Sequence, residues 1–331
     1  MYTTTNYTIE LFDRSGNSDE KIELAENVQL GFQKRPKELS PKFFYDERGS
    51  QLFEKITRLP EYYQTRTERK LLQQIAPRLA EEKFVELIEL GSGSSSKTRV
   101  LLSAMTTSGE LQHYIPIDVS GDFLLSTAEK LGNDYPTLQI RPVAGDFLDG
   151  LKGIERSGSA LVIFLGGTIG NLYRSEGVAF LTTVAEDMAE GDLFMMGVDL
   201  VKDPTLLHAA YNDSEGVTAE FNKNLLHVIN RELDATFNPD EFYHYAFYNP
   251  DDTRIEMRLV SKSKQEVNIG KLEIQVDFEE GESILTEISR KFTKASVGSM
   301  LSDAGMELIE WWGDDDELFG LIVARKERSG L

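Results

Sequence analysis

The sequence predicts an α/β fold built on a mainly parallel sheet. Short apolar runs alternate with helix-length amphipathic stretches between residues 84 and 200, which is typical of consecutive βαβ units. A glycine-bearing loop directly follows the first apolar run, where open parallel sheets bind ligands. The alternation breaks after about residue 201, so we expect a second structural unit beyond that point.

The elements of the sheet region follow from hydrophobic spacing. Ahead of it, residues 21–39 are expected to hold a helix that ends near Pro36, and apolar residues recur at helical spacing over 67–82. We then expect strands at 84–90, 114–119, 138–143, 160–165 and 192–200, separated by helices at 99–105, 123–131 and 176–189.

The rest of the chain divides into an insertion and a return to the sheet. We expect helices at 205–211 and 218–233, strands at 254–261 and 271–278, a helix at 293–305, and closing strands at 311–312 and 319–325. The expected sheet domain is therefore residues 67–201 plus 292–331. Residues 20–66 plus 202–291 are expected to form a second, α+β domain.

Composition excludes several classes of function. The net charge of −21 opposes binding to phosphate backbones, so no nucleic-acid partner is expected. There are no cysteines, and no two of the 4 histidines share helical ligand spacing, so we expect no metal site. No apolar run approaches the ~20 residues that cross a bilayer, and the N-terminus does not resemble a secretory signal. We expect a cytoplasmic protein with no membrane partner.

The loop from Gly91 to Lys97, GSGSSSK, is the first candidate site. Glycine lets the backbone approach a ligand closely, although a GxG pattern also fits a simple tight turn. A dinucleotide loop would carry glycine where this chain has Ser96, and the spacing of a phosphate-binding Walker loop is absent. Because S-adenosylmethionine (SAM) has no pyrophosphate, the loop suits this cofactor better than a dinucleotide.

Side chains at the following strand ends strengthen the prediction. Asp118 can accept hydrogen bonds from ribose hydroxyls, Asp146 can accept from an adenine amine, and Phe147 can stack on the ring. Lys97 can reach a carboxylate. Each has a local alternative: a helix cap for Asp118, a turn for Asp146 and a solvated charge for Lys97. Their order along consecutive strand ends predicts a SAM-dependent methyltransferase.

Longer motifs connect the chain to a known family. They are PKFFYDERGSQLFEKITRLPEYYQTRTE, ELGSGSSSKTR, IPIDVS, GDF, FLGGTIGN, DLVKD, FNKNLLHVINREL, RIEMRL and LTEISRKF, and they extend from about Pro41 to Arg325. With these motifs the chain closely resembles the histidine Nα-methyltransferases of ergothioneine biosynthesis. The resemblance implies a Rossmann-type class I methyltransferase domain with a second α+β substrate-binding domain formed by N-terminal and inserted segments.

The resemblance also implies site residues. Cofactor contacts are expected at Gly91, Lys97, Asp118, Asp146 and Phe147. Substrate contacts are expected at Tyr62, Asn171, Tyr211, Glu287, Ser289, Phe53 and Met257, the last within RIEMRL. Tyr45 and Phe53 match positions near the reacting amine, and we expect Tyr45 and Asn171 to serve catalysis.

Glu287 and Ser289 bear on the substrate. In an extended segment, residues two apart point to one face. A carboxylate there can accept an imidazole N–H, and a hydroxyl can bond the other ring nitrogen, although the pair also fits an ordinary surface strand. We expect a monomer that methylates the α-amine of L-histidine to trimethylhistidine (hercynine). The alternatives are an N-methyltransferase of another amino acid, such as a tryptophan derivative, and a non-catalytic amino-acid-binding regulator.

Overall fold

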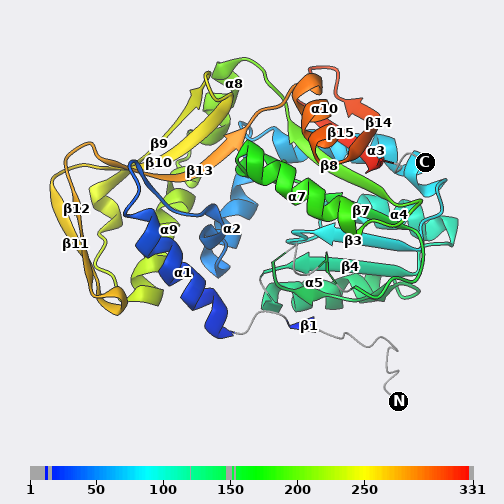
Figure 1. Cartoon of the computed structure of the whole chain (residues 1–331), viewed down its shortest axis with the longest axis horizontal. Helices are drawn as coiled ribbons and strands as arrows, with labels where there is room; N and C mark the ends of the chain where they lie inside the picture. The colour runs from blue at the N-terminus through cyan, green and yellow to red at the C-terminus, as the bar shows by residue number, and fades with distance from the viewer. Residues whose placement is uncertain (1–11, 14–16, 120, 147–150, 153, 328–331) are drawn as a thin grey trace.

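The chain folds around two separate sheets. The computed structural model describes residues 12–13, 17–119, 121–146, 151–152 and 154–327. Figure 1 shows the larger sheet with its helices in one half of the molecule and the smaller sheet in the other.

The larger sheet has the strand order β1-β6-β4-β3-β7-β8-β15-β14, with β5 also paired to β4. Its strands are β1 (Phe12–Asp13), β3 (Glu86–Leu90), β4 (His113–Asp118), β5 (Gln139–Ile140), β6 (Val143–Ala144), β7 (Ala160–Phe164), β8 (Leu193–Asp199), β14 (Met306–Gly313) and β15 (Phe319–Lys326). Only the pairings made by β15, with β8 and with β14, are antiparallel among those described. The carboxyl ends of β3, β4, β7 and β8 therefore share one edge, the usual ligand edge of such sheets.

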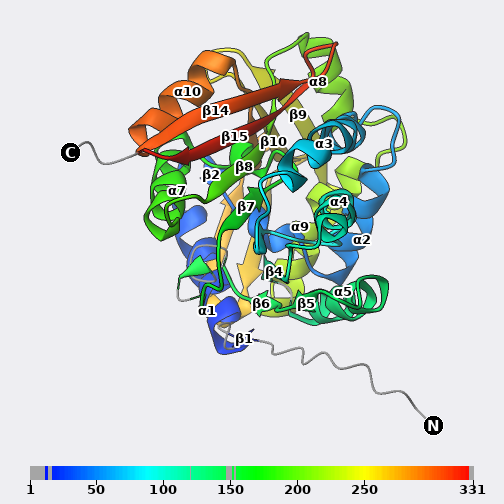
Figure 2. The same cartoon turned by 90° about the vertical axis from the view of Figure 1, so that its right-hand side faces the viewer.

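Helices cover both faces of this sheet (Figure 2). One face packs on α7 (Arg174–Asp187) and α10 (Lys294–Asp303). The opposite face packs on α3 (Gln64–Ala80), α4 (Arg99–Ser108) and α5 (Gly121–Asp134). Along β3, Ile88 joins the first core and Leu87 the second. Burial on both faces explains why these strands are continuous apolar runs in the sequence.

The smaller sheet has the order β2-β13-β10-β9, and β11 pairs with β12 beside it. The strands are β2 (Lys37–Glu38), β9 (Phe242–Asn249), β10 (Arg254–Ser261), β11 (Gln265–Ile269), β12 (Ile274–Phe278) and β13 (Ser283–Arg290). The helices of this half are α1 (Asn17–Gly31), α2 (Glu47–Ile56), α8 (Pro204–Tyr211) and α9 (Val217–Leu233). They share one core with the sheet, which includes Phe44, Phe221 and Ile255.

The architecture confirms the α/β prediction, including the closing strands, but several elements differ. The strand expected at 138–143 is two short pieces, since Pro142 between them has no N–H for a ladder. The strand expected from 271 begins at Ile274, because residues 270–272 form a 3₁₀ turn. The helix expected over 21–39 ends at Gly31, where a Cβ would lie 2.0 Å from the carbonyl oxygen of Glu38.

Candidate active site

A cavity of about 1250 Å³ lies between the two sheets, and both contribute to its walls. This volume exceeds the roughly 300–1,000 Å³ usual for a single ligand, so a cofactor and a substrate fit together. The cavity is lined by the described residues among those selected from the sequence: Tyr45, Phe53, Tyr62, Gly91, Lys97, Asp118, Asp146, Asn171, Tyr211, Met257, Glu287 and Ser289. Phe147 lies outside the described residues.

The glycine loop after β3 is fixed by backbone hydrogen bonds. The N–H groups of Gly91 and Ser92 donate to the carbonyl of Ile117, at 2.9 and 3.1 Å. Gly91 and Gly93 have φ values of 70° and 49°, which favour glycine. The Gly93 N–H donates to Oδ2 of Asp118 at 2.8 Å. The loop thereby holds the carboxylate of Asp118 at the end of β4, on the cavity wall.

A buried carboxylate lies beneath the loop. Glu89, on β3, accepts hydrogen bonds from the hydroxyls of Thr98, at 2.5 Å, and of Tyr114. Ser95 lies 2.9 Å from the Tyr114 hydroxyl. Burial raises the pKa of Glu89 to about 7, although both hydroxyls oppose this rise. Glu89 thus connects β3 to the start of α4. The only indication of this role in the sequence is that a charged residue stands in a mostly apolar strand.

Lys97 has a protein partner. Its ammonium forms an ion pair with the buried carboxylate of Glu68 on α3, a residue not selected from the sequence. Glu68 also accepts the N–H of Gly166 at 2.7 Å, which joins α3 to the loop after β7. An ammonium has three N–H donors, so this pairing is compatible with a further contact from Lys97.

Aromatic rings form another part of the cavity wall. Tyr45 lies 5.6 Å from Phe53 and 5.5 Å from Phe221 between ring centroids, and Phe53 lies 6.2 Å from Tyr62. All three pairs are close to edge-to-face, a favourable arrangement. Burial raises the pKa values of Tyr45 and Tyr62 above the usual 10. Both hydroxyls are therefore neutral at physiological pH.

Glu287 and Ser289 lie on β13, which confirms that this segment is extended. Within the described part of the chain, the Glu287 carboxylate has no side-chain hydrogen bond. Burial raises its pKa to about 7, while the charge of Lys291 opposes the shift. The Ser289 hydroxyl is buried and lies 2.7 Å from the hydroxyl of Tyr211 and 2.8 Å from Nζ of Lys291. Lys291 was not selected from the sequence.

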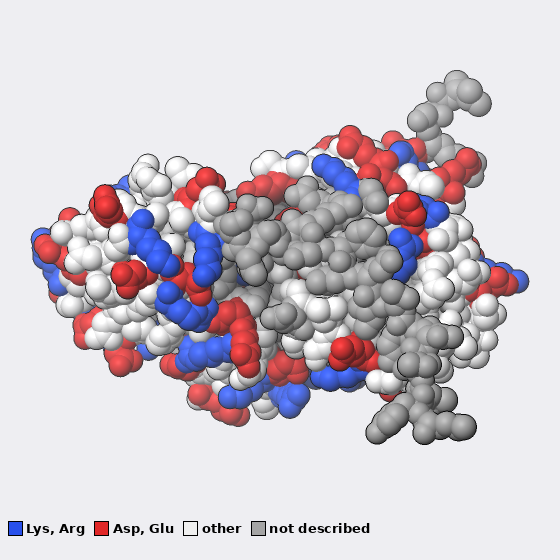
Figure 3. All heavy atoms as spheres, turned by 90° about the horizontal axis from the view of Figure 1, so that it is seen from below, with Lys and Arg blue, Asp and Glu red and all other residues white. Residues whose placement is uncertain are grey.

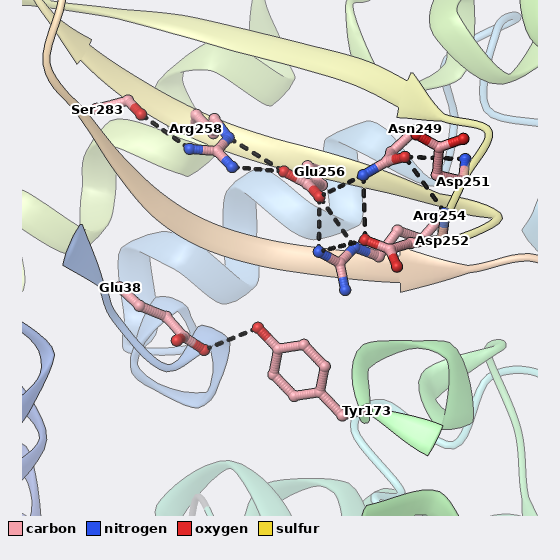
Figure 4. A network of polar contacts seen from close by, with 9 residues as sticks. All are labelled: Glu38, Tyr173, Asn249, Asp251, Asp252, Arg254, Glu256, Arg258 and Ser283. Atoms are coloured by element: carbon pink, nitrogen blue, oxygen red, sulfur yellow. Dashed lines mark hydrogen bonds and ion pairs between the residues drawn. The ribbon is translucent and has the colours of Figure 1, made fainter. Parts of the chain in front are cut away.

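A second polar network lies at the rim of the cavity (Figure 4). The Tyr173 hydroxyl, at the start of α7, donates to the Glu38 carboxylate of β2 at 3.3 Å, and both residues line the cavity. The guanidinium of Arg254 lies 5.5 Å from the centroid of the Tyr173 ring. These contacts join the smaller sheet to the helical layer of the larger one.

Several polar atoms in the cavity wall lack a protein partner. The amide of Gln64 and the hydroxyls of Ser92 and Thr218 are buried and have no hydrogen bond within the described residues. Buried polar atoms are ordinarily satisfied, so these atoms suit a polar ligand. Ser92 belongs to the glycine loop, where the amino-acid end or the sugar of SAM would provide such partners.

The described residues contain no group of acidic or histidine side chains that could hold a metal ion. Among them, no helix has the length and apolarity to span a membrane. On the surface drawn in Figure 3, Lys and Arg side chains are interspersed with Asp and Glu over the half that holds the smaller sheet.

Fold and site together define a class. A parallel sheet closed by antiparallel β15, with a glycine loop after β3 and an acidic residue ending β4, is the arrangement of a class I methyltransferase. The protein is therefore a SAM-dependent methyltransferase. Residues 24–326 match the model of one family, described as histidine-specific, SAM-dependent methyltransferases, and the chain belongs to this family.

Similar proteins cover most of the chain. A histidine N-alpha-methyltransferase of Mycobacterium tuberculosis is 45% identical over 96% of this chain and 99% of its own length. One of Mycolicibacterium smegmatis is 46% identical over 91% of this chain and 94% of its own length. Ergothioneine biosynthesis protein 1 of Neurospora crassa is 30% identical over 89% of this chain and 34% of its own, longer sequence.

Proposed function

We propose that the protein transfers methyl groups from SAM to the α-amine of L-histidine, giving trimethylhistidine for ergothioneine biosynthesis. The observation that carries the proposal is the pair Glu287 and Ser289, which stand on one strand inside the cavity. The names of the relatives, two histidine N-alpha-methyltransferases and an ergothioneine biosynthesis protein, support it.

The cofactor belongs at the carboxyl edge of the larger sheet. When bound there, SAM supplies an electrophilic methyl group on its sulfonium. Asp118 and Asp146 line the cavity; Asp118 would accept hydrogen bonds from the ribose hydroxyls, and Asp146 would accept one from the adenine amine. Gly91 allows close backbone approach, and Lys97 can meet the carboxylate of the methionine portion. Phe147, by its sequence position, would stack on the adenine.

The substrate belongs between β13 and the aromatic wall. Glu287 accepts a ring N–H of histidine and Ser289 bonds the other ring nitrogen, while Met257 and Phe53 pack against the substrate. Asn171 and Tyr62 bind the carboxylate and amine, and the Tyr211 oxygen accepts an amine N–H. Asn171 thereby also fixes the direction from which the amine attacks.

Positioning accounts for most of the chemistry. The α-amine must be neutral to attack, so it has to lose its proton before the methyl group is transferred. Tyr45 has a raised pKa, so it serves as a hydrogen-bond acceptor that guides the proton to water, not as a strong base. Tyr45, Phe53 and Tyr62 also present aromatic faces that attract a quaternary ammonium product, by about 0.5–2 kcal/mol per contact.

Cofactor binding and substrate binding are assigned to different domains, one around each sheet. Residues 67–201 plus 292–331 form the cofactor-binding domain, and residues 20–66 plus 202–291 form the substrate-binding domain. The two hydrophobic cores of the larger sheet and the separate core of the smaller sheet support this division. We further propose that the protein acts as a cytoplasmic monomer on a free amino acid, without a nucleic-acid or membrane partner.

A tryptophan derivative is the less favoured substrate. An indole ring has one N–H donor and no acceptor nitrogen, so it would offer no acceptor to the O–H of the buried Ser289. A non-catalytic binding protein is also disfavoured, because cofactor and substrate positions share one cavity.

The test is methyl transfer itself. The purified protein is incubated with methyl-labelled SAM and each free amino acid separately, and products are identified by mass. Histidine carrying up to three labelled methyl groups is the expected product. Labelling of tryptophan in its place would move the proposal to the alternative substrate, and binding of histidine without transfer would favour the regulator.

A further inference from the structure

Lys291 contacts Ser289, one of the two residues proposed to bind the histidine ring, but it does not itself line the cavity. Its side chain is fully buried. The ammonium is 2.8 Å from Oδ2 of Asp199, 2.8 Å from Oγ of Ser289 and 3.1 Å from the hydroxyl of Tyr211. An ammonium has three N–H donors and no acceptor, so these contacts use all of its hydrogen-bonding capacity.

These contacts determine the direction of the neighbouring hydrogen bonds. Tyr211 accepts from Lys291, and the acceptor for its own O–H among the described residues is Ser289, at 2.7 Å. Ser289 Oγ thus accepts from both Lys291 and Tyr211, which occupies its two lone pairs. Its own O–H finds no acceptor within the described structure, and Ser289 lines the cavity. Ser289 therefore presents a donor to a ligand.

We propose that Lys291 is a positioning residue that fixes Ser289 as a hydrogen-bond donor, so that the site takes the neutral imidazole and rejects the protonated ring. This inference rests on the proposed function. A neutral imidazole has one N–H, for the acceptor Glu287, and one bare nitrogen, for the donor Ser289. A protonated ring carries N–H on both nitrogens, and one of them would face the Ser289 hydrogen.

Other titratable groups surround this network. Asp199 also accepts a hydrogen bond from the hydroxyl of Tyr63, the residue before α3, at 2.9 Å, and pairs with Lys202. His244 Nε2 lies 2.8 Å from the Tyr211 carbonyl oxygen. Burial raises the pKa of Tyr63 and Tyr211, and the two lysines keep the pKa of Asp199 low. Burial lowers the pKa of His244, and that of Lys202 to about 8. Glu287, Tyr45 and Tyr62 face the network from the cavity.

The test compares two substrates on one enzyme. The ionisation of the surrounding protein groups and of the substrate α-amine then affects the turnover of both substrates. Histidine is compared with β-(1,2,4-triazol-3-yl)alanine, whose ring has similar size, one N–H and bare nitrogens, and stays neutral from pH 5.5 to 8. The ratio of kcat/KM, histidine over triazolylalanine, should fall about tenfold per pH unit below the imidazole pKa of roughly 6.5. A ratio that is constant or rises as the pH falls would overturn the inference.

Variants link the effect to Lys291. Lys291→Met frees a lone pair of Ser289 and Ser289→Ala removes the donor, so both should flatten the pH dependence of the ratio. Lys202→Met is the matched control, because Lys202 also pairs with Asp199 but has no contact with Ser289; its ratio should follow the unmodified enzyme. If Lys291→Met does not fold, Ser289→Ala alone tests the inference. If the kcat/KM ratio of Ser289→Ala depends on pH as in the unmodified enzyme, the inference is contradicted.

A wrong function and a wrong role for Lys291 would give different results. If histidine is not methylated at any pH, the proposed function is wrong. If histidine is methylated but the ratio is independent of pH, the function stands and the role of Lys291 is wrong.

Discussion

Lys291 Nζ lies 2.8 Å from Oδ2 of Asp199, and both side chains are buried. This ion pair joins the segment after β13, in the smaller sheet, to the carboxyl end of β8, in the larger sheet. A buried charge pair thus connects the half that holds the smaller sheet to the half that holds the larger sheet.

The first prediction concerns stability. Removing one partner of a buried ion pair costs about 3–5 kcal/mol, because the other charge is left uncompensated. Lys291→Met should therefore lower the free energy of unfolding in urea, at the lower end of this range since Asp199 keeps Lys202. Adding Asp199→Asn should cost less in the Lys291→Met background than in the unmodified protein. Strict additivity would contradict the coupling.

The second prediction concerns substrate affinity. Glu287→Ala removes the acceptor for the ring N–H, and a hydrogen bond to a charged group contributes about 1.5–3 kcal/mol. The KM for histidine should rise by about tenfold to a hundredfold, while the Kd for SAM, measured by calorimetry, stays unchanged. Glu280→Ala is the control, since Glu280 is exposed in the turn before β13. Unchanged histidine turnover in Glu287→Ala would refute the substrate assignment.

The third prediction concerns the cofactor. Asp118 accepts from the Gly93 N–H, and we propose that it also binds the ribose of SAM. Asp118→Asn should weaken SAM binding by about tenfold or more, by the same estimate for charged hydrogen bonds. Asp134→Asn, at an exposed ion pair with Arg99, should leave the calorimetric Kd as it is. Equal Kd values for the two variants would argue against a ribose contact.

The fourth prediction is an acid effect on stability. Glu256 on β10 is buried between Arg254 and Arg258, at 2.7 and 2.6 Å (Figure 4). Burial alone would raise its pKa, but the hydrogen bonds from both arginines prevail and lower it from 4.5 to about 2. Because the folded pKa is the lower one, the stabilisation is complete above pH 4.5 and is lost as the pH falls towards 2.

Glu256→Gln should accordingly cost about 3 kcal/mol at pH 7, and the gap to the unmodified protein should narrow below pH 4.5. Urea unfolding at a series of pH values measures this gap. Glu307→Gln, which breaks an exposed pair with Arg325, should cost no more than about 1 kcal/mol at any pH. A gap for Glu256→Gln that widens in acid would show that the sign is wrong.

Local signals were enough for most strands of the larger sheet, although β1 was not expected and the strand expected at 138–143 is two short pieces. Apolar runs such as residues 160–164 are buried on both faces, so their sequence is continuous and easy to recognise. The smaller sheet was harder to predict. β9 alternates exposed tyrosines such as Tyr243 and Tyr245 with buried Phe242, and its pairing with β10 depends on residues outside any short window. β9 and β11 were therefore not expected, and β13 was expected only conditionally.

The site shows the same limit. Glu287 and Ser289 could be selected because they are two apart, and the resemblance supplied the other positions. Glu68, Asp199 and Lys291 could not be selected, because each forms an ion pair with a residue that is distant in sequence. A lysine near a strand end ordinarily indicates a solvated charge, and only the fold reveals that Lys291 is fully buried.

The central claim is that the α-nitrogen of histidine receives the methyl groups. The most direct measurement is NMR of the product formed from ¹³C-methyl SAM and ¹⁵N-labelled histidine. The account predicts labelled methyl groups coupled to the α-nitrogen, up to three on each molecule, and unmodified ring nitrogens. Methyl label on a ring nitrogen, or no label on histidine at all, would contradict it.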